Sequence, residues 1–208
     1  MKKIHRKPSF NYEGKVNAEY DFVFGMDEVG RGSFAGPLVA SAVCFKKKFT
    51  WFKEINDSKL LTHKKREQLS KLILKNSIWS IEEINVEMIN KSGIGESNRR
   101  IFENLIKKIT KQYKNNNIFF LIDGRKQRIN NANLKFIIKG DRKSISIAAS
   151  SIIAKVYRDN LMKKYHKKYP QYNFINNKGY GTKFHREAIS KFGFCNIHRT
   201  IFNLNKFL

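Results

Sequence analysis

The amino-acid sequence predicts an α/β fold in which a mixed β-sheet is flanked by helices. Three observations favour this class. Short stretches rich in β-branched and aromatic residues come first, apolar stretches at helical spacing then alternate with further short apolar runs, and 208 residues with 41% hydrophobic content suffice for one sizeable core. We therefore expect a single domain over residues 1–208.

The N-terminal part of the chain predicts a lead segment followed by two strands. Residues 1–20 are polar, basic and non-periodic, so the core is expected to begin at about residue 21. Residues 22–29 and 37–45 are rich in β-branched and aromatic residues, and the glycine-containing stretch 30–36 separates them. Two neighbouring strands that pair antiparallel are the expected result.

Apolar spacing predicts the remaining elements. Thr62 is expected to cap a helix in which Leu69, Leu72 and Ile73 recur at helical spacing. The strand expected over 118–122 is apolar throughout, which is typical of a strand buried on both faces. The other expected elements are a strand over 78–84, a helix over 97–113, a strand over 134–138, a long helix over 144–165 and a shorter helix over 182–192.

The charge balance indicates a polyanionic partner. Lys and Arg number 42 against 17 Asp and Glu, which gives a formal net charge of +25 at pH 7. A positive field of this size attracts nucleic acid. Lysine enrichment of the whole chain without any function is the alternative explanation, so charge alone favours a nucleic-acid partner only modestly.

The cysteines and the apolar runs exclude several other classes. Cys44 and Cys195 are far apart and form no Cys-x-x-Cys pair, which argues against a disulfide framework and a zinc cluster. No apolar run follows the basic first residues, and no segment approaches the roughly 20 apolar residues of a membrane span. We expect a soluble cytoplasmic protein with no membrane partner.

Four acidic residues follow apolar runs that are predicted to be strands: Asp27, Glu28, Asp123 and Asp141. Ligand sites in open α/β sheets gather beyond the carboxyl ends of strands, so these side chains can converge. Two carboxylates ~4 Å apart repel by about 4 kcal/mol at an effective dielectric of ~20, and bound divalent cations relieve that repulsion. Oxygen ligands without His or Cys select Mg²⁺ or Mn²⁺, and paired metals support phosphodiester hydrolysis.

Each acid taken alone has a simpler explanation. Asp123 with Gly124 is a common turn dipeptide, and Asp141 can cap a helix near Ser144. In addition, neighbours in a regular strand point to opposite faces, so the first two acids can share one site only if their strand ends or bulges there. Gly30 and Gly32 directly afterwards make such a distortion sterically accessible.

Five segments, in chain order, resemble the ribonuclease HII family, the type 2 ribonucleases H. The first, GMDEVGRGSFAGP at 25–37, is highly specific and contains the first two acids. The others are DSKLLT at 57–62, LIDG at 121–124, KGD at 139–141 leading into SIAASSIIAKV at 146–156, and KGYGTK at 178–183 followed by IHR at 197–199. The resemblance covers roughly residues 21–200.

This resemblance implies a ribonuclease H-like mixed sheet flanked by helices, with a C-terminal helical extension. It divides the domain into a catalytic core over about 21–165 and a substrate-facing part over about 166–208. It also implies that Asp27, Glu28, Asp123 and Asp141 are catalytic and hold two Mg²⁺ or Mn²⁺ ions. The substrate-binding residues that it implies are Gly30, Arg31, Gly32, Lys59 and Tyr180.

The activity implied is hydrolysis of the RNA strand of RNA/DNA hybrids, with cuts on the 5′ side of ribonucleotides embedded in duplex DNA that leave 3′-hydroxyl and 5′-phosphate ends. A ribonuclease HIII-like enzyme that prefers long RNA tracts and a nucleic-acid-binding module without catalysis are the alternatives. All four acids are present, which counts against the second. A monomer is expected, and a replication clamp is left open as a partner.

Four further residues carry weaker expectations. His185 and His198 lack metal-ligand spacing and are interpreted as structural or substrate-facing. Asp159 follows a basic residue in a predicted helix and is expected to be exposed or salt-bridged. Arg142 stands directly beside Asp141, where its guanidinium either turns inward and weakens metal binding or turns outward toward phosphate.

Overall fold

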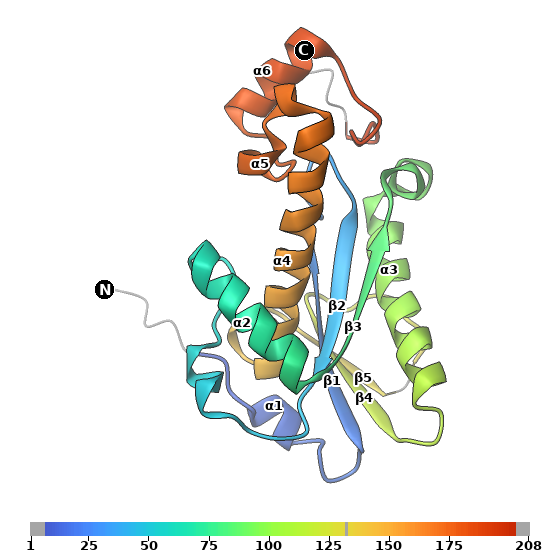
Figure 1. Ribbon diagram of the computed structural model, residues 1–208. Coiled ribbons are helices and arrows are strands. Elements are labelled where there is room, and N and C mark those ends of the chain that lie inside the picture. Colours follow the sequence, from blue (N-terminus) through green and yellow to red (C-terminus); the bar gives the residue numbers. More distant parts are fainter. Residues whose placement is uncertain (1–6, 132, 203–208) are drawn as a thin grey trace, which may run out of the picture.

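A five-stranded mixed sheet forms the centre of the computed structural model, which describes residues 7–131 and 133–202 (Figure 1). The strand order is β3-β2-β1-β4-β5. β1 pairs antiparallel with β2, as predicted, and β2 with β3, whereas β1 pairs parallel with β4 and β4 with β5. The strands are β1 (Phe22–Val29), β2 (Leu38–Cys44), β3 (Ile78–Ile84), β4 (Ile118–Asp123) and β5 (Leu134–Ile137).

Helices cover both faces of this sheet (Figure 1). α3 packs against β2 and β3 on one face, while α4 packs against β1 and β2 on the other and is itself covered by α2. The helices are α1 (Asn11–Gly14), η1 (Thr50–Glu54), α2 (His63–Asn76), α3 (Val86–Gln112), η2 (Gly140–Arg142), α4 (Ile145–Lys168), η3 (Pro170–Tyr172), α5 (Phe174–Asn177) and α6 (Lys183–Phe192). None of these helices of the described chain has the length and apolar character to cross a membrane.

The central strand β1 is buried along most of its length because both faces are covered. Phe24 and Met26 pack into the core on the α3 side. On the other face the backbone of α4 approaches so closely that a Cβ at Gly25 would lie 2.2 Å from the amide nitrogen of Ile147. Small residues at the start of α4 permit this approach, which brings the helix up to the carboxyl end of β1.

The predicted helices and strands are found, with one notable difference. The helix expected over 97–113 begins at Val86 instead, because Asn85 caps it by accepting a hydrogen bond from the amide of Met88. Gly93, with φ of 80°, kinks the helix between its two parts. The sequence pattern identified only the second part, since the Gly- and Ser-rich stretch 92–95 interrupts the apolar spacing.

The C-terminal elements form the predicted helical extension at the far end of α4 (Figure 1). η3, α5 and α6 pack there around the buried rings of Tyr172 and Phe174. The segment ahead of the sheet is attached as well. Glu13 in α1 is buried and accepts hydrogen bonds from the hydroxyls of Ser144 and Ser146, both at 2.6 Å, at the start of α4.

Candidate active site

The fold gathers the four predicted acids at one edge of the sheet. Asp27 and Glu28 lie near the end of β1, and Asp123 is the last residue of the neighbouring parallel strand β4. The register pairs Met26 with Ile122, so Asp27 and Asp123 follow directly at the same level. Asp141 arrives from the single turn η2, which follows β5 on the far side of β4.

The electrostatics of the four acids confirm that they are near neighbours. Burial raises the pKa of Asp27 well above its usual range, and the charges of Glu28 and Asp123 add to the shift. Burial and the charge of Asp123 raise the pKa of Glu28 to about 7. The pKa values of Asp123 and Asp141 are raised too, chiefly by burial. The protein alone does not compensate this cluster of negative charge.

The donor chemistry of the cluster suits a hard divalent ion, because every candidate ligand is a carboxylate oxygen. As the side chains stand, no three acidic, His or Cys groups within the described ranges converge closely enough to enclose an ion. Two carboxylates are turned to amides: Asp27 accepts from Glu28 N at 2.8 Å, and Asp123 accepts from Gly140 N at 2.5 Å. Repulsion between like charges favours this spread.

Of the two alternatives expected at Asp27 and Glu28, an end or a bulge of the strand, the structure shows the end. β1 keeps regular pairing with β2 through Val29, and its pairing with β4 ends at Met26. The strand therefore ends just beyond the two acids, and Gly30 turns the chain with φ of 94°. A Cβ at Gly30 would lie 2.2 Å from Arg158 Nε, so only glycine fits there.

The predicted substrate-binding residues lie in this turn, beside it, or close to the acids. Gly30 is buried, whereas Arg31 and Gly32 are exposed. The ring of Tyr180 is 36% exposed and has Arg158 at 5.7 Å from its centroid, so it lies beside the same loop. Lys59 is exposed, and its positive charge lowers the pKa of Glu28, Asp123 and Asp141, which places it close to the acids.

Two buried arginines hold the loop 30–37, and neither was predicted from the sequence. Arg158 Nη2 donates to the Ser33 hydroxyl at 2.9 Å and to the Ala35 carbonyl at 3.0 Å. Arg199 donates to the Gly36 carbonyl at 2.7 and 2.9 Å, and through Nη1 to the Arg31 carbonyl. Both guanidinium groups are fully buried, so they fix the backbone of the loop. The matched IHR segment was the only sequence signal for Arg199.

Asp57 is a fifth carboxylate near the cluster that sequence reasoning did not assign. It is 1% exposed and pairs with Arg142 at 2.9 Å. Its charge raises the pKa of Asp123 and Asp141. Arg142 thus turns to Asp57 and ties the turn that carries Asp141 to the loop before α2. The signal available was its position at the start of the matched DSKLLT segment.

The two histidines form a buried neutral pair under Tyr180, in agreement with a structural role. His185 Nδ1 lies 2.9 Å from the Tyr180 carbonyl, and its Nε2 lies 3.1 Å from His198 Nε2. The Cys195 amide donates to His198 Nδ1 at 2.8 Å. One set of tautomers satisfies all three contacts: His185 donates to the carbonyl, and His198 donates to His185. Asp159 is salt-bridged to Lys155 at 2.7 Å, as expected.

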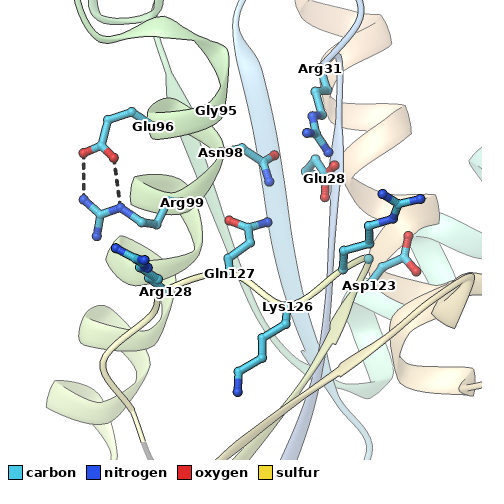
Figure 2. A pocket seen from close by; sticks show the side chains of 12 residues that line it. Glu28, Arg31, Gly95, Glu96, Asn98, Arg99, Asp123, Lys126, Gln127 and Arg128 are labelled. Carbon is cyan, nitrogen blue, oxygen red and sulfur yellow. Dashed lines mark hydrogen bonds and ion pairs between the residues drawn. The ribbon is translucent and has the colours of Figure 1, made fainter.

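A groove of about 910 Å³ opens beside the acids (Figure 2). Glu28 and Asp123 line one side of it, and α3 lines the other with Asn98 and Arg99. Arg31 and the loop 124–128 after β4 complete the lining, and the loop contributes three cationic side chains. The acid cluster is therefore open to a molecule much larger than a metal ion.

Sequence comparisons give one consistent result. A family model described as Ribonuclease HII matches residues 24–205. A Ribonuclease HII from Clostridium perfringens is 42% identical over 211 residues, which cover 99% of this chain and 75% of the relative. A Ribonuclease HII from Acholeplasma laidlawii is 45% identical over 186 residues, which cover 88% of each protein.

Solved structures show the same fold. The PCNA:RNase HII complex from Archaeoglobus fulgidus matches with a TM-score of 0.72 at 22% identity, covering 87% of this chain and 95% of that one. Bst-RNase HIII in complex with Mn²⁺ matches with a TM-score of 0.73 at 16% identity, covering 89% of this chain and 68% of that one. At these identities the two structures establish the architecture alone, and they confirm the mixed sheet with flanking helices.

Proposed function

The chain belongs to the ribonuclease HII family and is a ribonuclease H, and from this premise we propose that it cuts on the 5′ side of ribonucleotides embedded in duplex DNA as well as in RNA/DNA hybrids. The observation that carries the proposal is the buried acid cluster at the ends of β1, β4 and η2, open to a wide groove. The products are 3′-hydroxyl and 5′-phosphate ends.

The cofactor in this proposal is a pair of Mg²⁺ or Mn²⁺ ions held by Asp27, Glu28, Asp123 and Asp141. The oxygen-only donor set supports hard ions, and a structurally similar protein, Bst-RNase HIII, is in complex with Mn²⁺. Bound ions of this kind activate water and stabilise the leaving oxygen. The pKa of Glu28, raised to about 7, means that its carboxyl takes up a proton near neutral pH when no ion is present.

Substrate recognition in this proposal falls to the loop after β1. Arg158 and Arg199 fix that loop from behind, so the exposed backbone of Arg31 and Gly32 is presented to the substrate in one conformation. Arg31 then meets a phosphate, and the exposed ring of Tyr180 packs on the sugar of the ribonucleotide, whose 2′-hydroxyl bonds to the backbone. Lys59, on the other side of the acids, contacts a neighbouring phosphate.

The test is cleavage of a DNA duplex that contains a single ribonucleotide, with Mg²⁺, Mn²⁺ or chelator, followed by mapping of the ends. We expect metal-dependent cutting on the 5′ side of that ribonucleotide. Activity confined to long RNA/DNA hybrids would indicate ribonuclease HIII-like specificity instead. Binding without any cut under all conditions would indicate a binding module.

We also propose a replication clamp as the protein partner. The support is that the structurally similar Archaeoglobus fulgidus RNase HII is in complex with PCNA. Gel filtration of the chain with and without a sliding clamp from a related bacterium tests this. The chain alone is expected to elute as a monomer, and co-elution with the clamp is the result that supports the partner.

A further inference from the structure

The groove beside the acids is lined by positively charged side chains that form no ion pair in the described part of the chain. Arg125, Lys126 and Arg128 line it and are exposed, and within residues 7–131 and 133–202 none of the three makes a hydrogen bond or an ion pair. Arg99, across the groove on α3, is paired with Glu96 at 2.7 Å. The free charge of the groove therefore comes from the loop after β4 and, at the end next to the acids, from Arg31.

Two of these cations, Lys126 and Arg128, are directed away from the acid cluster, although they follow Asp123 closely in the chain. The charges that chiefly lower the pKa of Glu28 are those of Arg31 and Lys59. Figure 2 shows Lys126 projecting away from Glu28 and Asp123, and Arg128 lying on the side of α3. Side chains held in this way are available to an external anion.

A second observation, on the α3 side of the groove (its inner wall), also indicates that a binding partner is missing. Asn98 lines the groove from α3 and is 2% exposed, and its Oδ1 is buried without a hydrogen bond in the described part of the chain. An unpaired buried polar atom costs about 1–3 kcal/mol. Figure 2 shows the amide pointing from α3 toward Glu28. It is placed to donate to a phosphate oxygen or to accept from a sugar hydroxyl.

The proposed function fixes which part of the nucleic acid reaches this groove. The ribonucleotide lies 3′ of the cut and is recognised at residues 30–32 and Tyr180, on the side of the C-terminal helices. The cut phosphate lies at the acids. The groove begins beside Arg31 and the acids and leads from there toward α3 and the loop 124–128.

We propose that this groove binds the sugar-phosphate backbone of the cleaved strand on the 5′ side of the cut, with Arg125, Lys126 and Arg128 on successive phosphates and Asn98 at the nucleotide nearest the acids. This inference rests on the proposed function for its strand direction. It assigns to the groove a part of the affinity that is independent of base sequence. It also means that the enzyme binds the product strand that ends in the new 3′-hydroxyl.

The experiment compares two triple variants that remove equal charge. The groove variant is Arg125→Gln, Lys126→Gln and Arg128→Gln. The control is Lys107→Gln, Lys111→Gln and Lys114→Gln. These exposed lysines lie in the last turns of α3 and just after it, and have no ion pair in the described part of the chain. Binding to a duplex with one ribonucleotide is measured in chelator over a range of salt concentrations. The duplex arm is then shortened, either on the 5′ side or on the 3′ side of the cut.

We expect the groove variant to bind roughly 10- to 100-fold more weakly at low salt, with a salt slope smaller by about 2 to 3, while the control changes little. Shortening the 5′ arm must abolish the difference between wild type and the groove variant, and shortening the 3′ arm must leave it. Equal behaviour of the two triple variants, or dependence on the 3′ arm, would overturn the proposal.

A single substitution tests the inner wall. Asn98→Leu removes the unpartnered amide at similar volume, so the free energy of unfolding is expected to stay the same or rise, while binding weakens severalfold in a way that also depends on the 5′ arm. Unchanged binding would remove Asn98 from the proposal. Cleavage by the wild-type protein is measured in parallel. If it cuts 5′ of the ribonucleotide and the groove variant still behaves like the control, only the groove proposal has failed.

Discussion

Two regions of this molecule bury charge, and they differ in whether the protein itself provides hydrogen-bond partners for that charge. At the strand ends, Asp27, Glu28 and Asp123 are brought together so that burial and mutual repulsion raise their pKa values. Behind the loop 30–37, Arg158 and Arg199 are buried completely, yet carbonyl and hydroxyl oxygens accept their hydrogen bonds. Burial lowers the pKa of both arginines, and the charge of Arg158 adds to the shift of Arg199 to about 9. Their nitrogens nevertheless have acceptors within the protein, whereas the acids lack enough counter-charge.

This difference distinguishes buried charges that serve binding from buried charges that stabilise the fold. Buried charges that are fully hydrogen-bonded stabilise one conformation, and removing them costs stability. Buried charges that repel each other cost stability in the isolated protein and are retained for what they bind. Substitutions in the acid cluster are therefore expected to reduce activity at constant or higher stability, and substitutions of the arginines are expected to reduce stability itself.

The largest effect is expected from Asp123→Asn. Cleavage of a ribonucleotide-containing duplex should fall by about a thousandfold or more, because the variant loses one of the four proposed metal ligands. The free energy of unfolding in chelator should stay the same or rise, since the amide can still accept from Gly140 and one repelling charge is gone. Mg²⁺ should raise the melting temperature of the wild type more than that of the variant.

Glu87→Gln, a change of an exposed acid on α3 outside the cluster, is the matched control and should retain full activity. Full activity of Asp123→Asn would mean that the acid cluster is not the metal site. Loss of activity accompanied by a large loss of stability would place Asp123 with the arginines, as a structural charge, and the contrast between the two regions would disappear.

The next largest effect is expected from Arg158→Met. Four backbone and hydroxyl acceptors lose their donor: Pro37, Lys178, Ser33 and Ala35. The free energy of unfolding should fall by about 3 kcal/mol or more, measured by urea denaturation, which corresponds to a melting temperature roughly 6–12 °C lower. Arg100→Met, at an exposed arginine, should change stability by less than about 0.5 kcal/mol.

The sequence predicted the acid region far better than the arginine region, and the reason is local. Asp27 and Asp123 each stand at the end of an apolar run, so strand periodicity alone places them at one edge of the sheet. Arg158 and Arg199 reach acceptors 121 and 163 residues away in the chain. No local pattern distinguishes such a buried arginine from the many solvated ones.

Asp57 and the first part of α3 were missed for the same kind of reason. Asp57 gains its role from Arg142, 85 residues later, so its partner is visible only in the folded chain. The start of α3 depends on the cap at Asn85 and tolerates a kink at Gly93, where the apolar spacing is interrupted. Long-range pairing and tertiary packing decide both features.

The buried pair of His185 and His198 provides a pH test of the region whose buried groups are hydrogen-bonded within the protein. Burial lowers the pKa of His198 to about 4, below the ordinary 6.5, with a contribution from His185. The neutral ring therefore contributes stability that is fully present above about pH 6.5 and is lost as pH falls toward 4, by up to about 3 kcal/mol. NMR titration of the ring should show His198 neutral at pH 5.5, and a midpoint near 6.5 would contradict the buried pair.

The acid cluster should show the opposite dependence on pH. The carboxyl of Glu28 has a pKa raised to about 7 from 4.5, so its protonated form is favoured in the folded protein. Its contribution to stability is present below about pH 4.5 and is lost as pH rises through 7. In chelator, wild type should lose stability relative to Glu28→Gln between pH 5 and 8. Saturating Mg²⁺ should shrink that difference, and a difference that is independent of pH would show that Glu28 carries no such strain.

The smallest effect is expected at Asp57, which shares a feature with each region. Asp57 lies near the repelling acids, yet it is paired with Arg142 and accepts from the amide of Lys59 at 2.9 Å. If it positions the turn that carries Asp141, Asp57→Asn keeps one acceptor oxygen but presents an NH2 group where the other oxygen accepted, so one of the two hydrogen bonds is lost. Activity should fall by less than about tenfold. Asp57→Ala removes both hydrogen bonds and should raise the Mg²⁺ concentration needed for half-maximal activity more than it lowers the maximal rate. An effect of Asp57→Asn as large as that of Asp123→Asn would instead make Asp57 a fifth ligand. The site would then include an acid that is paired with an arginine.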